Sequence, residues 1–285
     1  MKHRRSGDIG GVLLVVLAAI FWGTTGVAAK LSYGFGMSPE GILTLRLGLT
    51  APIYAVYLLL GSVKKFSREA IAIGLLLLGP YHVAYYYSIA YVGVSTASLL
   101  LYTHPVAVAL LSRRVLGESV SARTYVALLL SVAGAAFVSL GDLRFSAEGI
   151  SLAVLSSLLF SLYVVFSKVA MTRGVRPGEV ALGTSIWALP TVALFQIARG
   201  FNWVRAVCPE VVAIAAYLAF VVTALAYVLY MNGLRVVGAA KATIVSTAEP
   251  LTATLASLVL FAEPLTLLKA IGGFLIVAAV VLVAR

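Results

Sequence analysis

The sequence predicts an all-α membrane protein with ten transmembrane helices in two inverted-topology repeats of five helices each. Composition is the first reason: 62% of the 285 residues are hydrophobic and only 11% are charged. A soluble domain has about 45–50% apolar and about 25% charged residues. The mean hydropathy of +1.06 agrees with this difference. Together these values exclude an ordinary soluble enzyme, a disordered protein and a coiled coil.

Ten apolar segments, each close to the roughly 20 residues that a bilayer-crossing helix needs, are separated by charged residues, Gly and Pro. They are expected at about 11–31, 40–60, 70–91, 95–116, 123–141, 149–171, 179–198, 210–232, 241–262 and 266–284. The first segment is long enough to cross the bilayer, so we expect no cleaved signal peptide. The chain is therefore expected to be a multi-pass protein of the cell membrane.

Basic residues predict the orientation of these spans. If the N-terminus is cytoplasmic, fifteen Lys and Arg residues fall on the inner side. Only five fall on the outer side, namely Lys30, Arg144, Arg199, Arg205 and Lys269. This positive-inside bias predicts that both termini are cytoplasmic. It also explains the formal net charge of +11, so no nucleic-acid partner is expected. Cys208 is the single cysteine, which excludes an intrachain disulfide and a cysteine-based metal cluster.

An internal repeat relates the two halves. A shift of 138 residues carries Trp22 onto Phe160 and Lys30 onto Lys168. A shift of 145 residues pairs Tyr85 with Tyr230, Gly93 with Gly238, Pro105 with Pro250, and Glu118 with Glu263. We expect one repeat in residues 1–142 and the other in residues 143–285. Because each holds an odd number of spans, the second must enter the membrane from the opposite side, as in many secondary transporters.

Several of these residues form a family pattern. Span 1 contains Ala18-Ala19-Ile20-Phe21-Trp22-Gly23, and Arg46 lies early in span 2. Spans 4 and 9 each contain a central proline and end in Gly117-Glu118 and Ala262-Glu263. With these features the chain resembles the EamA-like branch of the drug/metabolite transporter superfamily over nearly its whole length. The resemblance implies two tandem five-span units and transport of small metabolites, including amino acid export, but no particular substrate.

Glu249 is the only carboxylate expected deep inside a span. A charge at that depth costs roughly 2.5–3.5 kcal/mol on insertion scales, so it usually faces a cavity or a partner. It is a candidate for carrying a coupling proton or binding a substrate amine, with a structural pair as the alternative. Its repeat partner is His104, for which a hydrogen bond between helices is the favoured interpretation. Pro105 and Pro250 follow directly and are expected to kink spans 4 and 9, as in a gate.

Aromatic residues predict the wall of a substrate cavity. Tyr81, His82 and Tyr85 lie near the middle of span 3, and the 145-residue shift carries His82 and Tyr85 onto Tyr227 and Tyr230 of span 8. Aromatic rings with polar tips suit small amphipathic solutes. The predicted substrate-binding residues are Trp22, Tyr81, His82, Tyr85, Tyr102, Tyr163, Tyr227 and Tyr230. Tyr91 is expected to anchor span 3 at the membrane interface instead.

Three other charged residues are expected to be structural. Arg46 is a candidate for binding an anionic group, although a structural or snorkelling charge near an interface is the favoured interpretation. Glu118 and Glu263 are expected at the N-termini of spans 5 and 10, where the helix dipole favours a carboxylate.

The predicted function is therefore secondary transport, with spans 1, 3, 4, 6, 8 and 9 around a cavity that opens to each side in turn. Small organic metabolites, foremost amino acids, are the expected substrates, and protons are a candidate coupling ion. Three alternatives stay open: an organophosphate or nucleotide-sugar antiporter, a multidrug exporter, and a non-transporting sensor or scaffold. The sequence has no nucleotide-binding P-loop and no His-Glu-x-x-His or Gly-x-Ser-x-Gly motif. No enzymatic activity, cofactor or metal is therefore expected, and the expected partners are the substrate and the lipid bilayer.

Overall fold

The computed structural model describes residues 2–59, 67–140, 145–200, 202–261 and 264–284, which are almost entirely helical and contain no strand. The first half contains α1 (Lys2–Gly23), α2 (Thr25–Gly34), α3 (Pro39–Gly48), α4 (Thr50–Leu59), α5 (Arg68–Ile73), η1 (Gly74–Leu78), α6 (Gly79–Leu101), α7 (His104–Val115) and α8 (Ala122–Ser139). The second half contains α9 (Ala147–Thr172), α10 (Pro177–Arg199), η2 (Asn202–Ala206), α11 (Pro209–Tyr217), η3 (Leu218–Leu225), α12 (Ala226–Val237), α13 (Ala239–Ser246), α14 (Ala248–Phe261) and α15 (Leu267–Ala284).

Nine helical segments of the described chain are long and apolar enough to cross a membrane. The span expected at 40–60 is not among them, because it consists of α3 and α4, each ten residues long, joined through Leu49. Leu49 itself keeps a right-handed helical backbone, so the two short helices follow one another. The all-helical membrane fold predicted from composition is confirmed.

Backbone irregularities repeat at the spacing that the sequence predicts. The π-helical segment Gly74–Leu78 corresponds, 145 residues later, to part of the π-helical segment Leu218–Leu225. Gly93 and Gly238 separate consecutive spans in the two halves, with similar backbone angles (φ 76° and ψ 168°, φ 88° and ψ 165°). Apolar sequences often align by chance, but these matches are in backbone conformation. They therefore support the internal repeat independently of the sequence identities.

The spans with central prolines, which were expected to be kinked, are instead each divided into two helices next to the proline. The helix α6 ends at Leu101 and α7 begins at His104, while α13 ends at Ser246 and α14 begins at Ala248. A proline within the first turn of a helix loses no backbone hydrogen bond, because the N–H groups of that turn have no partner within the helix. Pro105 and Pro250 therefore start new helices instead of distorting long ones.

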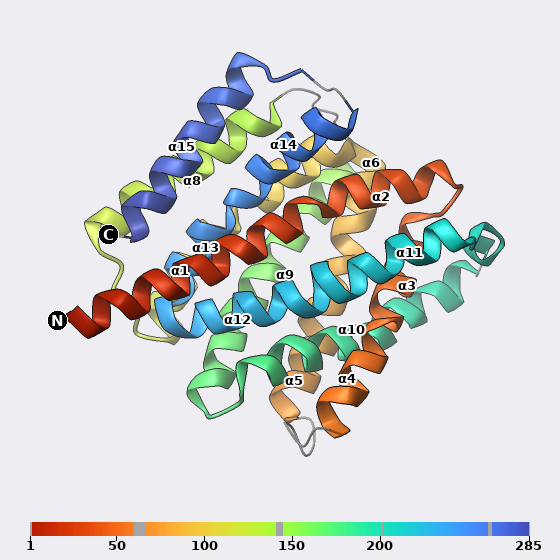
Figure 1. The fold of residues 1–285 in the computed structure, drawn as a ribbon, viewed down its shortest axis with the longest axis horizontal. Coiled ribbons are helices and arrows are strands. Elements are labelled where there is room, and N and C mark those ends of the chain that lie inside the picture. Colours follow the sequence, from red (N-terminus) through yellow and green to blue (C-terminus); the bar gives the residue numbers. More distant parts are fainter. Residues whose placement is uncertain (1, 60–66, 141–144, 201, 262–263, 285) are drawn as a thin grey trace.

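The two halves pack crosswise. The helix α1 packs against α12, α6 packs against α9, and α8 lies beside α15 (Figure 1). Span 1 thus contacts span 8, and span 6, its equivalent in the second repeat, contacts span 3, the equivalent of span 8. Each repeat therefore packs its first span against the third span of the other repeat. The buried hydrophobic side chains of nearly all these helices join in one large core, and fully buried residues come from α3, α9, α12 and α13 among others.

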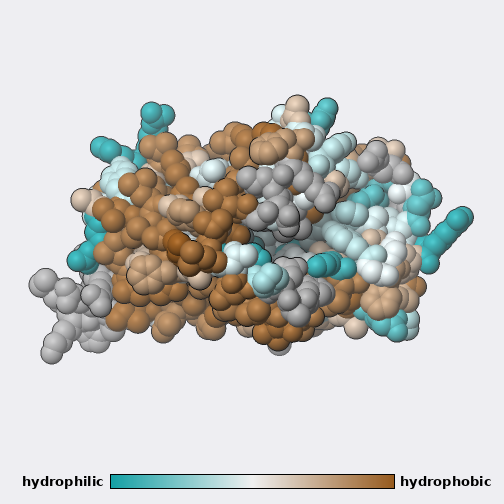
Figure 2. Space-filling view, turned by 90° about the horizontal axis from the view of Figure 1, so that it is seen from above, coloured by the Kyte–Doolittle hydropathy of each residue, from teal (hydrophilic) through white to brown (hydrophobic). Residues whose placement is uncertain are grey.

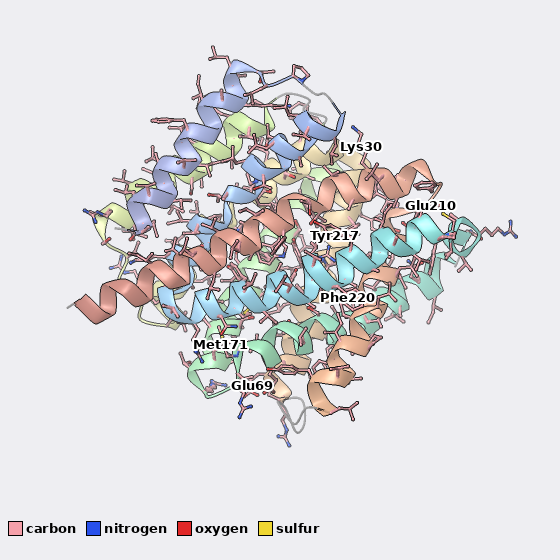
Figure 3. The ribbon with its side chains drawn as sticks, viewed as in Figure 1. Lys30, Glu69, Met171, Glu210, Tyr217 and Phe220 are labelled. Carbon is pink, nitrogen blue, oxygen red and sulfur yellow. The ribbon has the colours of Figure 1, made fainter. Side chains whose placement is uncertain are left out.

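The outer surface is suited to lipid. Figure 2 shows hydrophobic side chains over much of one face, and hydrophilic side chains mostly toward the two ends of the long axis. Lys30 and Glu210 lie toward one end of the bundle, and Glu69 and Met171 lie toward the other (Figure 3). The helix α1 begins, and α15 finishes, at the same end (Figure 1). An even number of crossings gives this arrangement.

Candidate functional site

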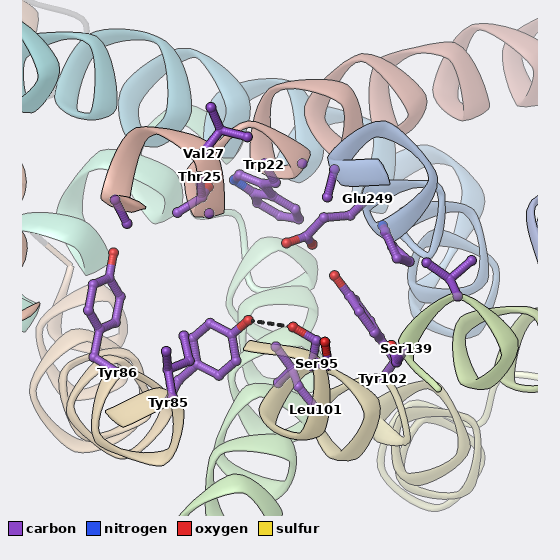
Figure 4. A pocket seen from close by; sticks show the side chains of 18 of the residues that line it. Trp22, Thr25, Val27, Tyr85, Tyr86, Ser95, Leu101, Tyr102, Ser139 and Glu249 are labelled. Carbon is purple, nitrogen blue, oxygen red and sulfur yellow. Dashed lines mark hydrogen bonds between the residues drawn. The ribbon is translucent and has the colours of Figure 1, made fainter. Parts of the chain in front are cut away.

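A cavity of about 620 Å³ lies between the two repeats and contains most of the predicted site residues. Its lining includes Trp22, Tyr81, His82, Tyr85, Tyr102, His104, Tyr227, Glu249 and Pro250. Both repeats contribute to its lining, the first more than the second, as expected for a substrate site near the repeat interface. The walls combine aromatic rings, such as Trp22 and Tyr85, with polar and charged side chains, such as Ser95 and Glu249 (Figure 4).

Trp22 is fixed by contacts that α12 and the π-helical segment before it provide. Its indole Nε1 donates to the backbone carbonyl of Val222 at 3.1 Å. Its ring packs against Tyr227 and Tyr230, with centroid distances of 5.1 and 4.9 Å. Because both the N–H and the ring have partners, the side chain forms a rigid part of the cavity wall.

Phe160 occupies the position of Trp22 in the second repeat. Its ring packs on Tyr81 at 5.0 Å and meets the His104 ring edge-on at 4.9 Å. It also lines the cavity. In both repeats, therefore, an aromatic ring of the first span packs against the aromatic face of the other repeat's third span: Trp22 of span 1 against span 8, and Phe160 of span 6 against span 3.

Three predicted site residues do not line this cavity. Tyr163 and Tyr230 are fully buried behind the wall, where the Tyr163 ring lies 6.2 Å from that of Tyr227. Pro105 also lies outside the lining. Each tyrosine follows a lining aromatic residue, Phe160 or Tyr227, by three positions, which turns its side chain by about 60° around the helix axis. These two tyrosines therefore do not face the cavity as predicted, and instead pack behind the residues that form its wall.

Glu249 directs its carboxylate into the cavity, toward the hydroxyl of Tyr102 (Figure 4). It lies in the first turn of α14, just after the helix break. Gly23 allows α1 to approach this turn closely, because a Cβ at Gly23 would lie 2.7 Å from the backbone oxygen of Glu249. On the facing wall the Tyr85 hydroxyl forms a 3.1 Å hydrogen bond with Ser98.

The two histidines of the cavity each keep one ring nitrogen without a partner. His104 Nδ1 bonds to the carbonyl of Leu101 at 2.9 Å, within its own turn. Its side chain thus makes a local bond instead of the expected bond between helices. Nε2 of His104 and Nε2 of His82 are buried and have no hydrogen-bond partner among the described residues. Buried polar atoms are nearly always paired, so these two nitrogens are exceptions within the cavity wall.

Arg46 is the main residue that sequence reasoning underestimated. Its side chain is 3% exposed and lines the cavity. Its Nε donates to Thr223 Oγ1 at 2.7 Å, and its Nη1 donates to the Tyr86 hydroxyl at 3.3 Å. The snorkelling interpretation is therefore wrong. Tyr86 was also missed, because it lies off the face that Tyr81 and Tyr85 share.

At one end the cavity reaches the surface. Lys30 and Lys269 belong to its lining, and Lys30 is exposed. At the opposite end a separate cavity of about 360 Å³ is lined by Glu118, Lys168 and Lys241 among others. The two cavities share no lining residue.

Charged contacts surround the junction of α12 and α13 at this second cavity. Both carboxylate oxygens of Glu118 accept the backbone N–H of Ala239. Lys168 Nζ donates to the carbonyls of Leu234 and Arg235 at 3.1 and 2.6 Å. Glu118 was expected to cap span 5, but Ser121 caps that helix, and Glu118 caps α13 of the other repeat instead. Glu263 lies outside the described residues.

Known proteins share this organisation. An uncharacterized transporter of Archaeoglobus fulgidus is 24% identical over 277 residues, which cover 96% of this chain and 98% of that protein. The uncharacterized inner membrane transporter YicL of Salmonella typhimurium is 27% identical and covers 96% and 94% of the two chains. A solved crystal structure that is 21% identical aligns with a TM-score of 0.82 over 95% of each chain, so it shares the fold.

A family model identifies the two halves separately. The model of the EamA-like transporter family matches residues 9–140 and again residues 147–285. Together these matches include most of the helices that line the cavity. The chain therefore belongs to the EamA-like transporter family and is a multi-pass helical membrane transporter.

Proposed function

We propose that this protein is a secondary transporter of small amphipathic organic solutes that carry an amine, foremost amino acids, and that it exports them. The observation that carries the proposal is the Glu249 carboxylate, which points into a cavity between the repeats that is lined in part by aromatic rings. Aromatic walls take up the apolar part of a solute, and the carboxylate pairs with its ammonium group. A carboxylate in this position is typical of intramembrane substrate or proton sites.

Alternating access is the mechanism that the two cavities support. The main cavity is open at the Lys30 end and separated from the second cavity at the Glu118 end. The positive-inside bias assigns Lys30 to the outer face and Lys168 to the inner face. This structure then corresponds to an outward-open state. Exchange of conformation between the inverted repeats gives the inward-open state.

Phosphorylated solutes fit this arrangement less well. An organophosphate or nucleotide-sugar antiporter needs Lys or Arg at the centre of its cavity. Lys168 and Lys241 line the second cavity instead of the main one. Arg46 is the only lysine or arginine that the described chain contributes to the buried wall of the main cavity.

A counterflow screen in proteoliposomes tests the proposal. Purified protein is reconstituted, loaded with one unlabelled solute, and assayed for exchange against amino acids, sugar phosphates and cationic dyes. We expect exchange of amino acids or related amines, and none in liposomes without protein. Exchange restricted to sugar phosphates contradicts the proposed substrate class, and exchange of no solute contradicts transport of these classes altogether.

A further inference from the structure

We infer that Arg46 binds an anionic group of the substrate and that the cavity selects zwitterions, with the anion at Arg46 and the amine at Glu249. This inference rests on the proposed function and deepens it by adding a second recognition residue. It follows from the burial of Arg46, from its hydrogen bonds and from the position of Glu249 in the same cavity.

Arg46 carries a buried positive charge that no carboxylate of the described residues contacts directly, and Glu249 acts on it only across the cavity. Its two acceptors, Thr223 and Tyr86, are neutral hydroxyls, and no carboxylate of a described residue forms an ion pair with it. A buried charge inside a membrane protein normally pairs with an opposite charge or faces a water-filled cavity. Because Arg46 lines the main cavity, the compensating anion is expected to come from the solute.

The hydrogen bonds of Arg46 hold the guanidinium in place and leave part of it available. A guanidinium has five N–H donors in a planar fork. The bonds to Thr223 and Tyr86 use Nε and one N–H of Nη1. Thr223 is itself fixed, since its hydroxyl donates to the carbonyl of Leu218 at 2.8 Å, five residues back in the π-helical segment. The remaining donors suit bidentate binding of a carboxylate.

The cavity therefore has two poles. In Figure 4 Tyr86, which accepts a hydrogen bond from Arg46, lies across the cavity from Glu249 and Tyr102, and Trp22 lies between them. A solute that carries only an amine gives Arg46 no direct counter-charge, and a solute that carries only an anion gives Glu249 none. A zwitterion neutralises both charges at once, so it is expected to bind best.

Three related probes separate these possibilities. L-leucine carries both charges, L-leucine methyl ester keeps only the amine, and N-acetyl-L-leucine keeps only the carboxylate. Binding to the purified protein is measured by calorimetry and exchange by counterflow. For the wild-type protein we expect leucine to bind more tightly than either derivative.

The variant Arg46→Gln tests the assignment directly. We expect it to weaken leucine binding by at least about tenfold, the loss expected for a charge-assisted bidentate contact. Binding of the methyl ester should change less than about twofold, because the ester makes no such contact. Arg46→Lys should restore part of the leucine affinity, since it returns the charge without the fork. Arg173→Gln, at an exposed site outside the cavity, is the matched control.

Retained binding of the ester shows that Arg46→Gln is folded, so a loss of leucine binding alone supports the inference. Equal losses for leucine and its ester, or no loss for either, overturn it. Loss of all binding by both Arg46→Gln and Arg46→Lys also overturns it, because the residue is then structural. If the wild-type protein exchanges the ester but not leucine, the preference for zwitterions is contradicted, whereas the proposed transport function is not. Exchange of no probe and no other solute contradicts both.

Discussion

Glu118 accepts the backbone N–H of Ala239 with both carboxylate oxygens, at 3.1 and 3.0 Å, and so joins the loop after α7 to the start of α13. These residues lie 121 positions apart and in different repeats. The carboxylate meets the positive end of the α13 dipole, and Lys168 meets the carbonyls at the negative end of α12. The junction at Gly238 thus has a negative side chain, Glu118, at the start of α13 and a positive side chain, Lys168, at the end of α12. Under the proposed orientation it closes the cytoplasmic end of the cavity.

Replacing Glu118 with Ala should loosen this closure. Loss of a helix N-cap costs about 1 kcal/mol, so the equilibrium should shift toward the inward-open state. In a Cys208→Ser background, a cysteine at Ala240 should react faster with a membrane-impermeant maleimide from the cytoplasmic side. Ala240 lines the second cavity, which makes it a suitable reporter. Glu148→Ala, at an exposed position, is the control, and unchanged labelling in Glu118→Ala refutes the closing role.

Replacing Gly238 with Ala should destabilise the protein. Gly238 has φ 88°, and a Cβ there would lie 3.1 Å from Glu118 Oε1. With ψ 165° this backbone lies in a region that is essentially restricted to glycine and costs another residue roughly 1–3 kcal/mol, and the contact with Glu118 adds to that cost. Thermal unfolding in detergent should show a lower midpoint for Gly238→Ala. Gly10→Ala, in a helix with open space around it, should leave the midpoint unchanged or raise it, and equal midpoints for the two variants contradict the account.

Replacing Tyr85 or His82 with Ala should impair transport more than replacing Tyr91. The first two line the cavity, whereas Tyr91 is 51% exposed and lies outside the lining. Initial rates of counterflow, corrected for the amount of protein in the liposomes, give the comparison. If Tyr91→Ala were the most damaging of the three, the assignment of the aromatic face would be wrong.

Both termini should face the cytoplasm. Fifteen basic residues against five predict this orientation, and α1 begins at the end of the bundle where α15 finishes. Reporter fusions with a cytoplasm-specific and an exterior-specific enzyme at each terminus test it. An external C-terminus together with an internal N-terminus is incompatible with two repeats of five spans.

The fold was predictable because it follows from local patterns. Apolar runs set the spans, and the 145-residue shift anticipated the paired breaks at Gly93 and Gly238. The break of span 2 into α3 and α4 was not anticipated, because nothing in the apolar run around Leu49 marks it.

The residues of the candidate cavity were anticipated only where a residue type is informative by itself. A lone intramembrane carboxylate and a run of tyrosines identified Glu249, Tyr81 and Tyr85. Arg46 was misjudged because its partner Thr223 lies 177 residues away, and Glu118 because it caps a helix of the other repeat. Such pairings depend on how the repeats cross, which periodicity within one helix does not encode.

Counterflow and pH-driven accumulation in liposomes that contain the Glu249→Gln variant test the central claim most directly. If Glu249 binds the substrate amine, as proposed, the variant should lose both exchange and accumulation of amino acids while its thermal stability stays within a few degrees of wild type. Loss of accumulation with intact exchange instead assigns a coupling proton to Glu249. Glu210→Gln, at an exposed position outside the cavity, should behave like wild type. Wild-type exchange, accumulation and stability in Glu249→Gln would contradict the account.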